Sequence, residues 1–191
     1  MKEEDLEPHK SAMENGGYCL DDTRFARLKQ WHGVLFQLSS AGYYLKQLKA
    51  RKPNLGNPED FYDAMALFSA FILQYSKCFT SGGKGQVTLD EHKVFASGGE
   101  ALAAHKRILD IRHNLVAHNG NSDLVLPDLG VKEQDDRFVV KHFFTFAIPL
   151  NELDAFEMAL ETTYRHTVLA LNRHLDSIGE KLGKIVLLDE A

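Results

Sequence analysis

The stretch from Asn57 to Ser76 reads NPEDFYDAMALFSAFILQYS and decides the fold of this chain. Pro58 suits the first position of a helix, because a helix start leaves its backbone N–H groups without intrahelical partners and proline has none. Apolar residues then recur every three or four positions, which is the spacing of one helix face. They are Phe61, Ala64, Met65, Phe68, Phe71, Ile72 and Tyr75. We therefore predict a strongly apolar helix at the centre of a helical bundle.

The sequence predicts three further long helices, one before this helix and two after it. Residues 21–51 carry an apolar residue every three, four or seven positions, and the cluster Lys52–Pro58 breaks the pattern. Ser97 and Glu100 form a capping box that opens a helix over 98–118, with Gly120 as its stop. Asn151 caps a last helix whose apolar face runs to Leu182. The chain is thus expected to be mainly α, a bundle of four long helices.

A different periodicity separates the third and fourth of these helices. Phe138, Val140, Phe144 and Phe146 alternate with other residues in a stretch rich in Phe and Val, as in a β-strand. The apolar segments 124–126 and 129–131 can pair with it across the polar turn 133–136. We predict a β-hairpin inserted before the last helix.

Composition limits the domain count and the class of protein. The chain has 191 residues, 44% of them apolar and 26% charged, which fits one globular domain over 21–183. A polar, mobile N-terminal tail, 1–20, and a C-terminal tail, 184–191, are expected on either side. The apolar runs are too short to cross a bilayer, the acidic N-terminus is no secretory signal, and the two cysteines lie far apart. These features predict a soluble cytoplasmic protein without a membrane partner.

The net charge of −5 does not favour phosphate binding by the whole surface, so such a role must be local. One segment of the third helix is locally basic. Residues 105–118 hold Lys106, Arg107, Arg112 and three histidines against one acid, Asp110. Histidine transfers protons near neutral pH, and the arginine fork matches phosphate oxygens. Residues Arg112 and His118 point about 120° apart on a regular helix, with about 9 Å of rise between them, so a second subunit is one way to bring them together.

The segment RHNLVAH, Arg112–His118, followed by Asn119, resembles the signature of the HEPN superfamily, and in particular its abortive-infection branch. That signature is an arginine, a polar residue and, after a short gap, a histidine near the end of a helix. The resemblance implies a helical bundle that acts as a metal-independent endoribonuclease without a cofactor, often a phage-defence or toxin component. Its partners would be RNA, a second copy of the chain and an antitoxin protein.

Carried over residue by residue, the resemblance assigns roles within this segment. Arg112 and His118 would be the catalytic pair, with their site at a two-fold dimer interface. His113, Asn114 and Asn119 would support that pair. The neighbouring cations Lys106 and Arg107 would bind RNA.

Other interpretations of the same residues stay open. His118 extends the apolar face of Ala104, Ile108, Ile111 and Leu115, so it can be a buried core residue, and Arg112 can pair with a carboxylate. A non-catalytic HEPN-like scaffold for a nucleotide, nucleic acid or protein is the alternative function. A metal-dependent hydrolase is disfavoured, because no His, Asp, Glu or Cys set has ligand spacing. The pairs Arg165-His166 and Arg173-His174 on the last helix can bind phosphate, although a solvated helix face is the simpler interpretation.

Overall fold

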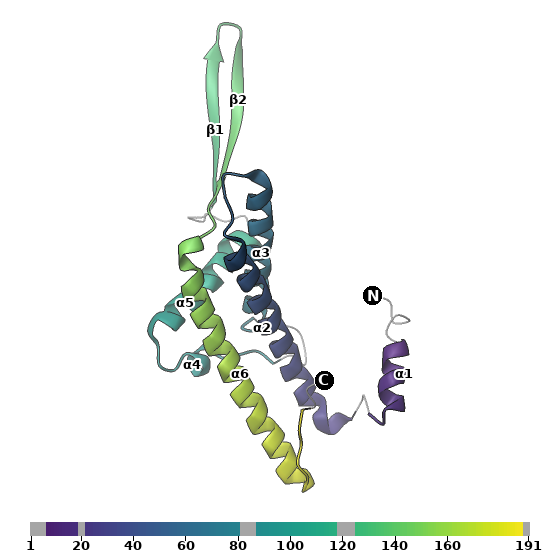
Figure 1. Ribbon diagram of the computed structural model, residues 1–191. Helices are drawn as coiled ribbons and strands as arrows, with labels where there is room; N and C mark the ends of the chain where they lie inside the picture. The colour runs from purple at the N-terminus through teal and green to yellow at the C-terminus, as the bar shows by residue number, and fades with distance from the viewer. Residues whose placement is uncertain (1–6, 19–21, 81–86, 118–124, 189–191) are drawn as a thin grey trace.

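A computed structural model describes residues 7–18, 22–80, 87–117 and 125–188 of the chain. It is mainly helical, with one two-stranded antiparallel hairpin before the last long helix (Figure 1). The predicted fold class is therefore confirmed. The elements in order are α1 (Glu7–Asn15), η2 (Thr23–Phe25), α2 (Ala26–Arg51), α3 (Pro58–Lys77), α4 (Glu91–Val94), α5 (Gly99–Ile111), the π-helix η3 (Arg112–Ala117), β1 (Val125–Gln134), β2 (Arg137–Phe146), η4 (Leu150–Glu152) and α6 (Leu153–Leu182).

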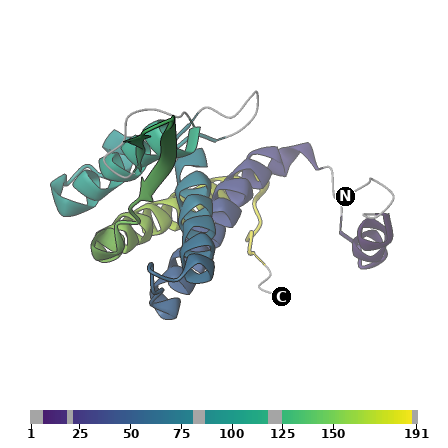
Figure 2. The same cartoon turned by 90° about the horizontal axis from the view of Figure 1, so that it is seen from above.

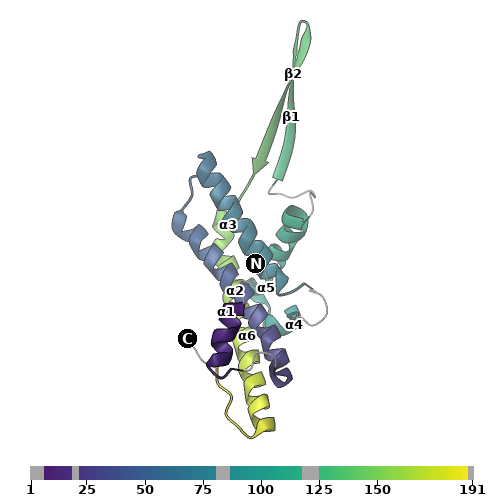
Figure 3. The same cartoon turned by 90° about the vertical axis from the view of Figure 1, so that its right-hand side faces the viewer.

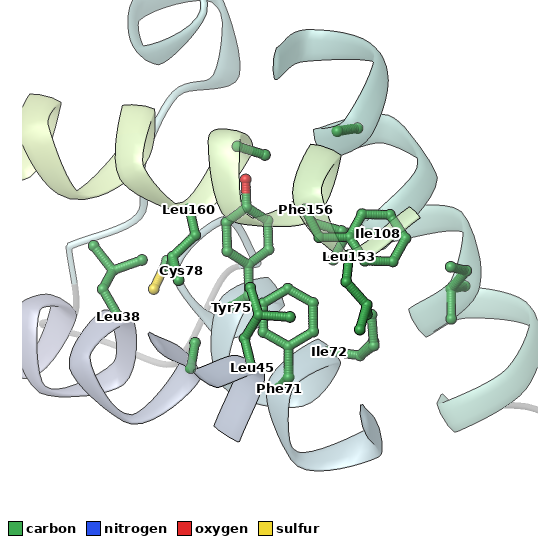
Figure 4. Close-up of a cluster of buried hydrophobic side chains, with 14 of the residues drawn as sticks. Leu38, Leu45, Phe71, Ile72, Tyr75, Cys78, Ile108, Leu153, Phe156 and Leu160 are labelled. Atoms are coloured by element: carbon green, nitrogen blue, oxygen red, sulfur yellow. The ribbon is translucent and has the colours of Figure 1, made fainter. Parts of the chain in front are cut away.

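Helix α3 forms the centre of the bundle, as its composition predicts. The Asn57 side chain accepts hydrogen bonds from the backbone N–H groups of Glu59 and Asp60, and Pro58 follows it. Phe68, Phe71 and Tyr75 are fully buried. Phe71 stacks on Phe156 of α6, with ring centroids 6.0 Å apart (Figure 4). Aromatic burial of this kind is a large favourable contribution to the folding free energy.

Helix α2 packs against both α3 and α6, and α5 packs against α6. The core has two parts. The larger cluster lies around α3, and a smaller one joins Leu28 of α2 to Leu171, Leu175 and Ile178 of α6. Trp31 is half-buried and contacts both clusters. The buried residues of the smaller cluster belong to the start of α2 and the C-terminal half of α6. These parts of the two helices lie at the end of the bundle opposite the hairpin (Figures 1 and 3).

Several element starts differ from the predictions. Gly98 and Gly99 have φ angles of 66° and 80°, so a left-handed glycine pair leads into α5 and Ser97 does not cap it. A 3₁₀ turn that includes Asn151 precedes α6, which begins at Leu153 without a side-chain cap. Regular α-helix ends at Ile111 and continues as a π-helix. Apolar spacing identifies a buried helix face but does not distinguish hydrogen bonds to residue i−4 from those to i−5.

The N-terminal segment also differs, because Glu7–Asn15 forms a helix where no element was predicted. It stands apart from the bundle in Figures 1 and 2. No helix in the described residues combines the length and apolarity needed to cross a membrane.

The hairpin projects away from the helices (Figure 3). Its strands pair from Val125 with Phe146 to Gln134 with Arg137, around a turn at Asp135-Asp136. One face of its outer part carries Leu129, Val131, Phe138 and Val140, which are all exposed. An isolated two-stranded hairpin is only marginally stable in water, so the exposed outer part of this one should add little to the stability of the domain.

We predict that the bundle folds without the outer hairpin. Replacing residues 131–140 by Asn-Gly joins the paired residues Gly130 and Lys141 through a two-residue turn. The free energy of unfolding should change by less than about 1 kcal/mol, because only a solvated loop is shortened. Urea unfolding followed by circular dichroism measures it. A loss of several kcal/mol would show that the hairpin supports the core.

Candidate functional site

The segment with the predicted catalytic pair begins where α5 becomes π-helical. Arg112 is the first residue of η3 and is half-buried, and α3 packs against this turn. His118 and Asn119 lie outside the described residues. The angle expected between residues 112 and 118 on a regular helix does not apply here, because the hydrogen-bond register widens from Arg112 onward. Single π-helical turns occur frequently at functional sites.

Arg112 differs from Arg107, its neighbour on the same helix. Arg107 Nε lies 3.2 Å from Glu152 Oε2, and its guanidinium also lies 3.6 Å from Asp110. Within the described part of the chain, Arg112 makes no ion pair. Arg112, a half-buried residue, thus keeps a charge that no carboxylate of these residues pairs with, whereas Arg107 ties α5 to the start of α6. If Arg107 binds RNA as predicted, the RNA phosphates have to compete with these two carboxylates for its guanidinium.

Two of the three predicted supporting residues, His113 and Asn114, are described, and they lie near the predicted RNA-binding residue Lys106 at the helix end. Asn114 Nδ2 donates a hydrogen bond of 2.6 Å to Asp110 Oδ1. Lys106 and His113 are exposed, seven residues apart, on the side of the helix that also carries Asp110. The structure therefore brings Lys106, Asp110, His113 and Asn114 together next to Arg112.

His105 lies in the predicted basic segment but is a core residue. It is fully buried between the rings of Phe79 and Phe95, at centroid distances of 4.3 and 4.7 Å. It therefore contributes nothing to the exposed basic surface. The predicted apolar face is confirmed at Ala104, Ile108 and Ile111, which are all buried, whereas the side chain of Leu115 and the whole of His118 lie outside the described part of the chain.

A chain of polar groups crosses the core at His105. The Tyr75 hydroxyl lies 2.9 Å from His105 Nδ1 and 3.3 Å from Thr163 Oγ1. Glu91 Oε2 lies 3.3 Å from His105 Nε2, but away from the direction a hydrogen bond needs. The carboxylate still favours a proton on Nε2, so the Tyr75 hydroxyl donates to Nδ1. Thr163 donates to the Ala159 carbonyl oxygen. These contacts join α3, α4, α5 and α6.

Burial is the main cause of the shifted pKa values of His105, Tyr75 and the nearby Cys78. It lowers the pKa of His105 below its usual value, although Glu91 acts in the opposite direction. Burial likewise raises the pKa of Tyr75 and raises that of the Cys78 thiol to about 12. A neutral imidazole, a neutral phenol and an inert thiol are the groups of a structural core.

Sequence reasoning missed the roles of His105 and Tyr75 as a buried polar pair. A signal was present, since His105 directly follows Ala104 on the buried face and lies three residues before Ile108. In the described residues, no group of three or more His, Cys, Asp or Glu side chains is placed to hold a metal ion. Neither a known family model, nor a curated protein, nor a solved structure matches this chain. The HEPN-like interpretation thus depends on the motif residues themselves.

We predict that acid destabilises the fold through His105. The unfolded chain binds a proton at about pH 6.5, and the folded chain only at lower pH, so the free energy of unfolding should fall as the pH decreases below about 6.5. His105 should contribute no pH dependence above that value. The limiting slope for one group is about 1.4 kcal/mol per pH unit.

Urea unfolding between pH 7.5 and 5 measures this slope. His105→Asn keeps an amide near the Tyr75 hydroxyl but does not titrate, so its stability should depend less on pH than that of the wild type. His92→Asn is the matched control, because the His92 side chain is 89% exposed. His166 and His174 also have lowered pKa values and remain in all three proteins. Equal slopes in wild type and His105→Asn would contradict the assignment.

Proposed function

We propose that this protein is a metal-independent endoribonuclease of the HEPN-like type, with an active site that a second copy of the chain completes. The observation that carries the proposal is Arg112, a half-buried arginine without a carboxylate partner in the described residues, at the first residue of a π-helical turn. It opens the motif that ends at His118. An arginine without a carboxylate partner is well suited to bind a phosphate group, because its planar guanidinium matches two phosphate oxygens.

The chemistry needs only side chains of the motif and the RNA itself. The 2′-hydroxyl oxygen attacks the adjacent phosphorus, the bond from phosphorus to the 5′-oxygen breaks, and a 2′,3′-cyclic phosphate and a 5′-hydroxyl remain. His118 takes the proton of the 2′-hydroxyl and then gives it to the leaving 5′-oxygen. Arg112 stabilises the negative charge of the phosphorane. Lys106 and His113 lie on the exposed side next to Arg112 and contact neighbouring phosphates.

An antitoxin protein and a role in phage defence belong to the same proposal, because the motif resembles that branch of the superfamily. The alternative is a non-catalytic scaffold that uses the same surface to bind a nucleic acid, a nucleotide or a protein. Only an activity measurement separates the two.

We expect the purified protein to cleave RNA in the presence of EDTA. Arg112→Ala and His118→Ala should each lower the rate by about 10²-fold or more, because they remove charge stabilisation and proton transfer. His113→Ala should have a smaller effect. Products should end in 2′,3′-cyclic phosphate, and DNA should not be cleaved because it lacks the 2′-hydroxyl. Arg51→Ala is the control, since Arg51 pairs with Asp63 on the exposed ends of α2 and α3.

Two outcomes of this experiment argue against the proposal in different ways. Equal rates in the wild type and both motif variants would locate the cleavage elsewhere or in a contaminant. A wild type that cleaves no RNA would favour the scaffold.

We also expect a homodimer of two 21.5-kDa chains that buries the surface around Arg112. Light scattering at micromolar concentration measures the mass. A mixture of Arg112→Ala and His118→Ala chains should recover activity that neither has alone, because a mixed dimer retains one intact arginine and one intact histidine. A monomer, or a mixture without recovery, would argue against a shared site.

A further inference from the structure

The end of the bundle opposite the hairpin carries unusual charge. Helix α2 contains no Asp or Glu, and its first turn, which lies at this end, carries Arg27 and Lys29. Residues 162–175 of α6 also lack acids. The whole chain has a net charge of −5, so these acid-free segments are positive within a protein that is negative overall. A local positive field of this kind attracts anions to one part of an acidic protein.

The two acid-free segments meet at a pocket between α2 and α6. Its lining is Arg27, Trp31, Ala170, Arg173 and His174, and its volume is about 300 Å³. Arg27 and Arg173 are exposed, and neither makes an ion pair within the described residues. Trp31 is half-buried because one side of it packs on the two core clusters. The pocket thus combines two uncompensated arginines with a firmly held aromatic ring.

Electrostatics shows that the positive groups lie close together. The pKa of His174 is lowered by burial and then by the charges of Arg27 and Lys181. The pKa of His166 is lowered by burial and then by Arg173 and Lys93. These charges disfavour a proton on either histidine, and no carboxylate of the described residues is paired with Arg27 or Arg173. A bound anion would offset the positive charge of the two arginines.

We propose that the α2–α6 pocket binds single-stranded nucleic acid, with Arg27 and Arg173 on the phosphate backbone and Trp31 against a base. Arginine forks match phosphate oxygens, and an aromatic ring beside a basic surface is the usual platform for an unpaired base. A free phosphate would use the arginines but not the tryptophan. This inference goes beyond RNA cleavage, because Arg112 does not line the pocket and the pocket lies at the end of the bundle opposite the hairpin.

The probe is a 12-residue oligothymidylate, a DNA strand that has no 2′-hydroxyl and so tests binding apart from cleavage. Trp31 is the only tryptophan of the chain, so its emission reports on this pocket alone. Titration of the full chain should quench that emission, and the anisotropy of a labelled probe should rise with the same affinity. Added salt should weaken the binding that both signals report.

Arg27→Gln combined with Arg173→Gln should weaken binding by about tenfold or more and lower the slope of log affinity against log salt by about 1.4, which is about 0.7 for each lost phosphate contact. Lys46→Gln combined with Lys132→Gln removes the same charge at exposed positions away from the pocket and should change affinity by less than about threefold. Circular dichroism confirms that both variants are folded.

Several results would overturn the proposal. They are equal weakening in the two double variants, anisotropy that rises without a change in Trp31 emission, and a probe that does not bind at 50 mM salt. Inorganic phosphate that displaces the probe at equal concentration would indicate a site for free phosphate instead. Phosphatidylglycerol vesicles that quench Trp31 more strongly than the probe does would indicate a membrane surface. If the wild-type protein binds the probe at this pocket but cleaves no RNA, only the proposed function is contradicted.

Discussion

The arrangement of the helices depends on one buried polar contact, that between the Tyr75 hydroxyl and His105 Nδ1. Both side chains are fully buried, and a buried polar group without a partner costs about 1–3 kcal/mol. The contact therefore requires α3 and α5 to meet in one register, and Thr163 adds α6 to the same point. Apolar packing alone would tolerate small rotations of these helices, whereas the hydrogen bond does not.

The position of His105 in the core also determines where Arg112 lies on the same helix. Arg112 comes seven residues after His105 and four after the buried Ile108, so it continues their side of the helix to the point where the core ends. There the helix widens into the π-turn. The polar core thus determines where the candidate site can form.

The two ends of the bundle have different physical characters. One end carries the motif segment and the projecting hairpin, whose outer face exposes Val131, Phe138 and Val140. The other end carries the acid-free parts of α2 and α6 around Trp31. Arg107 and Lys49, by contrast, are held by carboxylates of η4 and α6 and serve the fold. Cations paired with carboxylates therefore stabilise the fold, whereas cations without such a partner in the described residues indicate candidate binding surfaces.

Sequence alone determined the elements whose signal is local. The Asn57-Pro58 start of α3, the apolar faces of α2 and α6 and the alternation in β2 each follow from spacing along the chain, because a helix or strand buries residues at a fixed period. Tertiary structure alone decided what depends on residues far apart in the chain. His105 became a core residue because Phe79, Phe95 and Tyr75 surround it, Arg107 was neutralised by Glu152, and Arg27 met Arg173 across two helices. A charged or polar side chain has the same local pattern whether it is exposed, paired or buried, and only the packed helices determine which of these it is.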